Sequence, residues 1–392
     1  MSLTNKKIVV ILGGNILNSG IVDYCKQKDY FVVVYITKNC NLNCKYCLQS
    51  YKDPVNMSFA IAKEIVQKEM VNARKLNRKM ELRLMGGEPF MNFGLIKELC
   101  EWIWSEYSSE DINVSIRTNG TLMSEDKKQW LSEHHSLLLC GPSIDGIHEV
   151  NKINRGINKD IKDFFIKYWP QYGAHGTLFP DSVEYLYDSF VYFNEVLHFP
   201  FDIKIGLGTK WDEEVVIILE EQLKKLAHYL IEHPGLEIPS VFIKDISQFG
   251  KKAINDPNFN CLGNQGGAVY DVDGKQYSCE TLMPLVHGLN KSAEINSQER
   301  LMREYAVDAE CKDCPALVIC PTCPSMNIKY RGDSKKSATL TTTCKAFKVQ
   351  LKMSAYYTLL KYEDCIKNGV EIPLSVINNL NAASEILSNN SF

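Results

Sequence analysis

The chain has no apolar run of the length that a membrane-spanning helix needs. Its apolar stretches, such as Phe31–Ile36 and Val215–Leu219, are short. The amino-terminal stretch MSLTNKKIVVILGG is apolar only briefly and reads as a strand that ends in glycines. A secretion signal would have a longer apolar core followed by a small-residue cleavage site. We therefore expect a cytoplasmic protein with no membrane contact.

An excess of positive charge is also missing. The 44 lysines and arginines are outnumbered by 47 acidic residues, which leaves a net charge of -3. Binding to nucleic acid through a broad basic surface is therefore not expected. Hydrophobic residues make up 45% of the 392 residues, so a large domain and a second one can form.

Cysteine, by contrast, is abundant, with fourteen in the chain. In a reducing compartment, clustered thiols indicate metal rather than disulfides. Cys40, Cys44 and Cys47 form C-x3-C-x2-C directly after Phe31–Ile36. Three thiolates on a cubane of four irons leave one iron open, where a small molecule can bind and receive an electron. The alternatives are an incomplete zinc site, which this spacing fits poorly, and chance.

Strand and helix patterns alternate over residues 31–232 with a period of roughly 30 residues. Strands are expected at 31–36, 80–85, 113–118, 137–140, 175–179 and 201–206. Helices are expected at 58–76, 93–107, 125–133, 160–168, 183–197 and 213–232. Such alternation predicts an α/β fold with a parallel sheet curled into a partial (β/α)6 barrel. In such barrels the chemistry lies at the carboxyl ends of the strands.

Beyond residue 234 the alternation stops, and cysteines punctuate short segments. Metal would hold such a region more than an apolar core. The expected divisions are an N-terminal βα extension (1–30), the barrel (31–234), a bridge (235–260), a metal-held domain (261–360) and a tail (361–392).

This second group of cysteines has a spacing of its own. Cys261 and Cys279 flank Gly274 as C-x12-G-x4-C. A run of C-x2-C-x5-C-x2-C and one later cysteine follow, namely Cys311, Cys314, Cys320, Cys323 and Cys344. Read alone, paired C-x2-C knuckles most often hold zinc.

Three loops that follow strands are rich in glycine and short polar residues. Gly86, Gly87 and Glu88 lie in MGGEP, where glycines let the backbone approach a ligand closely. Asn119 lies in RTNG and Ser143 in SIDG. Their side chains either reach hydroxyl groups of a ligand or only cap the turns that follow.

The cysteine loop, with Tyr46 before its last cysteine, resembles that of the radical S-adenosylmethionine (SAM) superfamily. The second cysteine group resembles the SPASM extension, which houses two auxiliary [4Fe–4S] clusters. The resemblance covers roughly residues 31–350 and implies SAM and three [4Fe–4S] clusters as cofactors. In this family an electron from the open cluster cleaves SAM, and the resulting 5′-deoxyadenosyl radical takes a hydrogen atom from the substrate.

The resemblance also implies roles for single residues. Cys40, Cys44 and Cys47 would hold the SAM-binding cluster. Arg155, in NKINRG, would pair with the SAM carboxylate, a task suited to a guanidinium. The residues implied in further contacts with SAM are Tyr46, Gly86, Gly87, Glu88, Asn119 and Ser143.

For the auxiliary clusters, the resemblance assigns an outer set of Cys311, Cys314, Cys320 and Cys344. It assigns an inner set of Cys261, Cys279 and Cys323. The last pair departs from the family's commoner C-x3-C, since only two residues separate Cys320 from Cys323. Two closed clusters need eight cysteines and the motifs supply seven. Either one iron of the inner cluster is open, or Cys140 or Cys365 completes it.

The function implied is a peptide maturase that acts on a ribosomally made precursor and forms thioether or other crosslinks. Its partners would be the precursor peptide and a reductant such as flavodoxin or ferredoxin. A leader peptide would be bound by the barrel itself or by a separate protein.

Two other functions stay open. A dehydrogenase like the anaerobic sulfatase maturases would make formylglycine, with a base directly after the inner cysteine. That base is typically aspartate, whereas this chain has Glu280, our candidate catalytic proton acceptor. The third possibility is a non-catalytic, metal-stabilised binding or electron-transfer module, which analysis of iron and sulfide would identify.

Overall fold

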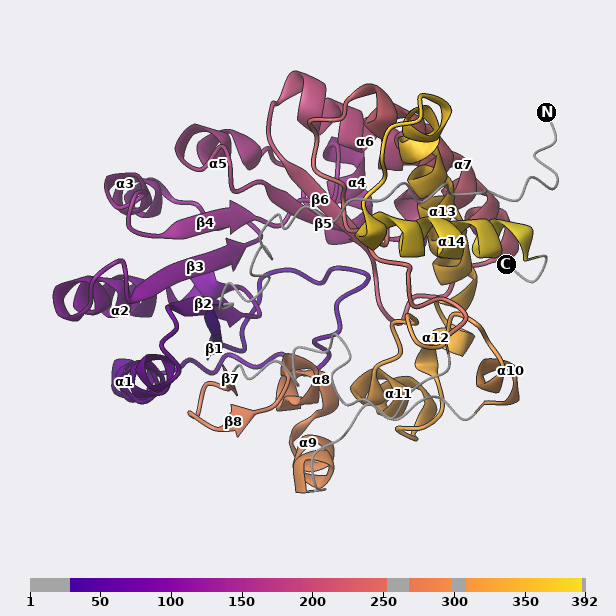
Figure 1. Cartoon of the computed structure of the whole chain (residues 1–392). Coiled ribbons are helices and arrows are strands. Elements are labelled where there is room, and N and C mark those ends of the chain that lie inside the picture. Colours follow the sequence, from indigo (N-terminus) through magenta and orange to yellow (C-terminus); the bar gives the residue numbers. More distant parts are fainter. Residues whose placement is uncertain (1–28, 252–267, 298–307, 390–392) are drawn as a thin grey trace.

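The computed structural model describes residues 29–251, 268–297 and 308–389. Most of the expected amino-terminal extension, and Cys261, lie outside the described residues. Within the barrel region strands and helices alternate, and neighbouring strands run parallel (Figure 1).

Four of these strands form one sheet in the order β4-β3-β2-β1. They are β1 (Tyr30–Thr37), β2 (Met80–Gly86), β3 (Ile112–Thr118) and β4 (Leu139–Pro142). The helices between them are α1 (Phe59–Lys75), α2 (Phe93–Glu106) and α3 (Glu125–Glu133). Each helix carries the chain back to the start of the next strand, so the strands pair in parallel.

Two further parallel strands continue this row. β5 (Ala174–Leu178) pairs with β6 (Phe201–Ile205), and a parallel bridge joins Ser143, just past β4, to His175 of β5. The helices of this half are α4 (His148–Arg155), α5 (Lys162–Tyr168) and α7 (Glu213–Glu232). The row of six parallel strands confirms the predicted α/β fold with a partial barrel.

The prediction of a single helix over residues 183–197 is wrong. The segment consists of a 3-10 turn η2 (Pro180–Tyr185), helix α6 (Leu186–Val191) and a π-helical turn η3 (Tyr192–Val196). In this wider turn the Leu197 amide donates to the Tyr192 carbonyl, five residues back. Phe193 stacks on Phe201 of β6 with ring centroids 4.4 Å apart. Tertiary packing of aromatic rings, which no local pattern records, accompanies the irregular turn.

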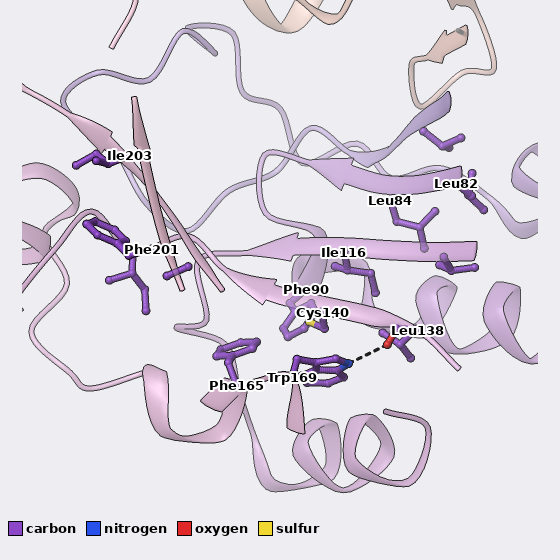
Figure 2. Packing of buried hydrophobic residues seen from close by; sticks show 14 of the residues in the cluster. Leu82, Leu84, Phe90, Ile116, Leu138, Cys140, Phe165, Trp169, Phe201 and Ile203 are labelled. Atoms are coloured by element: carbon purple, nitrogen blue, oxygen red, sulfur yellow. Dashed lines mark hydrogen bonds between the residues drawn. The ribbon is translucent and has the colours of Figure 1, made fainter. Parts of the chain in front are cut away.

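One face of the sheet carries the core. Alternate residues of β1 and β2 are almost fully buried on this face, as in Val32, Val34, Leu82 and Leu84. Figure 2 shows the same packing around Phe165 and Trp169, whose indole Nε1 donates to the Leu138 carbonyl at 2.8 Å. On the opposite face Arg83 is exposed, whereas Tyr35 packs with Val33 and Met85 in a second, smaller cluster.

The cysteine-rich segment shares a sheet with the barrel, which the sequence did not predict. β7 (Ala268–Tyr270) adds to β1 in parallel, and β8 (Gln276–Tyr277) follows it antiparallel. Glu69 of α1 is buried and accepts hydrogen bonds from the hydroxyls of Tyr30 and Tyr270, each at 2.5 Å. This shared carboxylate joins α1, β1 and β7.

Short helices follow β8. They are η5 (Glu280–Leu282), α8 (Pro284–His287), α9 (Leu289–Ser297), α10 (Ala309–Lys312), α11 (Pro324–Arg331) and α12 (Ala338–Thr341).

Two long helices end the described chain. α13 (Cys344–Lys367) packs against α7 of the barrel, and α14 (Leu374–Ser388) packs against α13 (Figure 1). Ile386 of α14 is buried together with Ile246 and Phe249 of the bridge. The segment expected as a tail thus contains the end of α13 and a packed helix. Among the described helices, none has both the length and the apolar character needed to cross a bilayer.

Candidate active site

The C-x3-C-x2-C loop leaves β1 at the carboxyl edge of the sheet, where β2 and β3 also end. MGGEP, at the end of β2, runs along the start of this loop. The Gly87 amide donates to the Thr37 carbonyl at 3.1 Å, and the Glu88 amide donates to the Asn39 carbonyl at 2.8 Å. Two predicted motifs are therefore joined directly through their backbones.

The two glycines allow this close approach. A Cβ atom on Gly86 would lie 2.7 Å from the Thr37 carbonyl oxygen. One on Gly87 would lie 2.3 Å from the Asn39 carbonyl oxygen and 2.8 Å from the Cβ of Cys40. The cysteine loop would have to move to admit either side chain.

We expect Gly87→Ala to lower the free energy of unfolding by about 1–3 kcal/mol, as overpacking does, and to reduce the iron bound. Gly94→Ala is the matched control, because its added Cβ has no neighbour within 4 Å. Gly94 lies in α2, where alanine is the better helix former. Chemical denaturation and iron analysis measure both effects. Equal stability and iron content in the two variants would contradict this account.

Glu88 is buried, and its side chain connects the loops that follow β2 and β3. Its carboxylate accepts hydrogen bonds from the Phe90 amide (3.1 Å), the Thr118 hydroxyl (2.6 Å) and the Asn119 amide (2.7 Å). Burial raises the pKa of Glu88, and these hydrogen bonds oppose the rise. Its carboxylate thus ties the end of β2 to the end of β3, while a contact between MGGEP and SAM stays a prediction.

Asn119 connects the loop after β3 to the cysteine loop. The side-chain nitrogen of Asn119 donates to the side-chain oxygen of Asn41 at 3.0 Å. The side-chain oxygen of Asn119 accepts a hydrogen bond from the Thr121 hydroxyl at 2.6 Å. Asn41 in turn donates to the Thr121 hydroxyl at 2.7 Å. No sequence signal singled out Asn41 and Thr121, because short polar residues are common in loops of every kind.

Asp145, from SIDG, is the centre of a buried polar network. It accepts hydrogen bonds from the Tyr46 hydroxyl (2.8 Å), an Arg155 Nη (2.7 Å) and the Thr177 amide (2.8 Å). Burial and the charge of Asp145 raise the pKa of Tyr46 well above its usual range. The SIDG motif pointed to Ser143 rather than Asp145, so the central position of Asp145 comes from the structure. Ser143, two residues earlier, lies at the bridge to β5.

Arg155 therefore has a protein partner in this structure. Its guanidinium lies 5.5 Å from the centre of the Tyr46 ring, and its Nε is buried without a hydrogen-bond partner in the described chain. An unpaired buried donor beside the cysteine loop suits an anionic ligand group. Pairing of Arg155 with the SAM carboxylate stays a prediction.

The three loop cysteines are partly exposed and lie close together. The pKa of Cys44 is raised to about 11, chiefly by burial; the charge of Arg155 opposes the rise, and the charges of Asp145, Cys47 and Cys40 contribute to it. Burial also raises the pKa of Cys40. Coordination to a metal keeps a thiol deprotonated, which offsets this mutual repulsion. The donor set fits an iron–sulfur cluster with three protein ligands.

The four cysteines predicted for the outer auxiliary cluster also lie near one another. The pKa of Cys311 is raised to about 11, first by burial and then by the charges of Asp308, Cys320, Cys344 and Cys314. These thiols come from α10, the turn that follows and the start of α13. Within the described ranges, no three His, Cys, Asp or Glu side chains are arranged to hold a single metal ion.

Of the inner set, Cys279 and Cys323 are described. Burial raises the pKa of Cys279, and the charge of Cys323 contributes to the rise. Cys140 is fully buried in the barrel core, near Phe90 and Ile116 (Figure 2).

Cys365 lies far from Cys344, the last cysteine of the outer set. It follows Cys344 by 365 − 344 = 21 residues within α13, or about 31 Å along the helix axis.

Glu280 reaches the carboxyl edge of the sheet from η5. Its carboxylate accepts a hydrogen bond from the Tyr35 hydroxyl of β1 at 3.1 Å. Burial and the charge of Glu280 raise the pKa of Tyr35 well above its usual range. Gln49, just past the third loop cysteine, donates to the Gly86 carbonyl at 3.1 Å. Sequence reasoning reached Glu280 but not Tyr35, since 245 residues separate the two.

Comparisons with known proteins show several partial likenesses. Residues 30–160 match the family model described as a 4Fe-4S single cluster domain. An uncharacterised protein of Methanocaldococcus jannaschii is 26% identical over 69% of this chain and 90% of its own length. A cysteine-type anaerobic sulfatase-maturating enzyme of Clostridium perfringens is 31% identical over 30% of this chain and 33% of its own length. A GTP 3',8-cyclase of Haemophilus influenzae is 30% identical over 37% of this chain and 45% of its own length.

Solved structures resemble most of the chain, including its second half. Native anSMEcpe with bound AdoMet and Kp18Cys peptide has a TM-score of 0.59 at 19% identity, over 87% of this chain and 98% of that one. Streptococcus suis SuiB bound to precursor peptide SuiA has a TM-score of 0.55 at 15% identity, over 79% of this chain and 75% of that one. These likenesses show a shared fold.

Proposed function

We propose that the chain is a radical SAM enzyme, namely a cytoplasmic maturase that modifies a peptide. The observation that carries the proposal is the joining of a second cysteine-rich unit to the barrel through β7 and α13. Two structures with this fold, anSMEcpe and SuiB, hold peptides. The GTP 3',8-cyclase match, which involves a nucleotide, spans only 37% of this chain.

A [4Fe–4S] cluster with bound SAM supplies a 5′-deoxyadenosyl radical, which takes a hydrogen atom from the substrate. The protein's own residues would hold and orient these groups. Cys40, Cys44 and Cys47 would bind the cluster. MGGEP would offer its backbone to the SAM amine, and Arg155 would offer its unpaired Nε to the SAM carboxylate. Asn119 and Ser143 lie at the same strand edge, where sugar hydroxyls would be bound.

The test is co-expression with the short reading frames beside the gene, followed by mass spectrometry of each peptide. A thioether or carbon–carbon crosslink removes two hydrogens from the peptide, and this loss should require the loop cysteines and SAM. A reductant such as flavodoxin or ferredoxin would supply the electron, and a leader peptide would bind the barrel or a separate protein. Turnover of a small molecule, with every peptide unchanged, would overturn the proposal.

We further propose that the inner auxiliary cluster has one iron without a cysteine ligand from the described chain. Cys140 is buried in the core, and Cys365 lies at the end of α13 opposite Cys344. A substrate thiolate could bind this iron, which would lower the pKa of the thiol and fix its sulfur for C–S bond formation. A crystal structure without substrate that shows a fourth protein thiolate on this cluster would refute the idea.

The second candidate is a formylglycine-forming dehydrogenase, favoured by the 31% identity to a cysteine-type sulfatase-maturating enzyme. Here the product distinguishes the two, because conversion of cysteine to formylglycine exchanges sulfur for oxygen. A crosslink retains the sulfur. Mass spectrometry of the modified peptide therefore decides between them.

For either product we expect Glu280→Gln to lower the yield of modified peptide by about 10²-fold, the usual loss for a general base. The amide cannot take up a proton, yet its oxygen can still accept the hydrogen bond from Tyr35. Tyr35→Phe is the control for loss of that hydrogen bond alone. An unchanged yield for Glu280→Gln would make Glu280 an ordinary turn residue.

A further inference from the structure

Two cations of the barrel lie along the C-x3-C-x2-C loop. The Lys52 Nζ donates to the Leu42 carbonyl at 2.6 Å, and the Arg155 guanidinium lies 5.5 Å from the centre of the Tyr46 ring. Lys52 and Arg155 both belong to the barrel, as a loop residue and the last residue of α4. The third cation comes from elsewhere in the chain.

This third cation is Lys329 of α11, in the cysteine-rich unit. Its Nζ donates to the Leu48 carbonyl (3.0 Å), the Ser50 hydroxyl (2.9 Å) and the Val286 carbonyl (2.9 Å). An ammonium group has three N–H donors, and here all three have acceptors. Leu48 directly follows the last loop cysteine.

Apolar packing holds this contact in place. Leu48 packs with Val286 of α8 and Met326 of α11 in one small hydrophobic cluster, which Cys323 also touches. Burial lowers the pKa of Lys329, and the charge of Cys47 opposes that change. The cation is therefore confined between the radical-cluster loop and the segment that carries an auxiliary-cluster cysteine.

We propose that Lys329 is the charge through which the cysteine-rich unit raises the reduction potential of the cluster held by the C-x3-C-x2-C loop. One electron from a low-potential donor, such as dithionite or a flavodoxin, enters this site without a proton, so the site becomes more negative by one charge. A fixed cation stabilises the more negative state, and charge and hydrogen bonding near a cluster set its potential. The inference rests on the proposed function only in that this loop binds a cluster.

The experiment is a redox titration of the full-length holoprotein followed by electron paramagnetic resonance. The signal that changes when SAM is added identifies the loop cluster. In Lys329→Gln and Lys329→Met, we expect reduction to become roughly tenfold less favourable, a shift of about 59 mV to more negative potential for one electron. Lys329→Arg keeps the charge and should stay near the unmodified protein. Lys291→Met is the control, because Lys291 is paired with Glu294 on α9.

Two outcomes would overturn the inference. Unchanged potentials in the Gln and Met variants would remove the charge effect, and an equal shift in the Arg variant would make Lys329 a structural support only. If Lys329→Met binds too little iron to titrate, Lys329→Gln still carries the test, since its amide can donate to Leu48 and Ser50. Absence of any SAM-sensitive cluster in the unmodified protein would instead refute the proposed function.

Discussion

Replacement of Cys40, Cys44 and Cys47 together by alanine should abolish formation of 5′-deoxyadenosine from SAM. The reduced, unmodified protein should form it even without a peptide, because a cluster held by three thiolates would leave one iron open to SAM. The iron content should fall from about twelve to about eight per chain, since the two proposed auxiliary clusters would depend on separate cysteines. Chromatography of the reaction products and iron and sulfide analysis measure both effects.

Cys365→Ala serves as the control for loss of a thiol. Cys365 is partly exposed and lies outside every cysteine motif, so its variant should keep all of its iron and its reaction with SAM. Continued SAM cleavage by the triple variant would mean that the radical cluster is not held by this loop. Zinc without sulfide in the unmodified protein would end the radical SAM proposal altogether.

The second large effect is expected at the inner auxiliary cluster. Cys279→Ala/Cys323→Ala should remove about four irons per chain and abolish the modified peptide while 5′-deoxyadenosine still forms. The two thiols lie close together beside Glu280, whereas the loop proposed to bind SAM would have its own cluster ligands. The reaction should therefore stop after SAM cleavage.

Parallel assays of peptide mass and 5′-deoxyadenosine on the same samples test this separation. Cys100→Ala is a suitable control because Cys100 is fully buried within α2, in the barrel core. It should cost stability but keep all three clusters. Full yield of modified peptide from the double variant would show that the inner cluster takes no part in the chemistry.

Local patterns in the sequence determined the elements of the barrel. α3 and α7 begin and end at the predicted residues, Glu125–Glu133 and Glu213–Glu232. Both helices have acidic residues in the first turn, which favour the amino-terminal end of a helix. Short-range periodicity and end signals were sufficient here because the packing of these helices agrees with them.

Cysteine spacing determined the first group of thiols. The three loop cysteines lie close in space, whereas the outer auxiliary set was implied by the family resemblance, and its ligation of a cluster stays a prediction. Ligands close in sequence need little further information, since a short loop keeps them near one another. Cys261 is the one member of the predicted ligand sets outside the described residues.

Only the tertiary structure decided how the two halves meet. Glu69 accepts a hydrogen bond from Tyr270, 201 residues away in the sequence, and Glu280 accepts one from Tyr35, 245 residues away. Lys329 reaches Leu48 across 281 residues. Such contacts depend on the global path of the chain, whereas a periodic pattern reports only a residue's nearest neighbours along the chain. The charges around the candidate site therefore follow from packing that the sequence pattern does not contain.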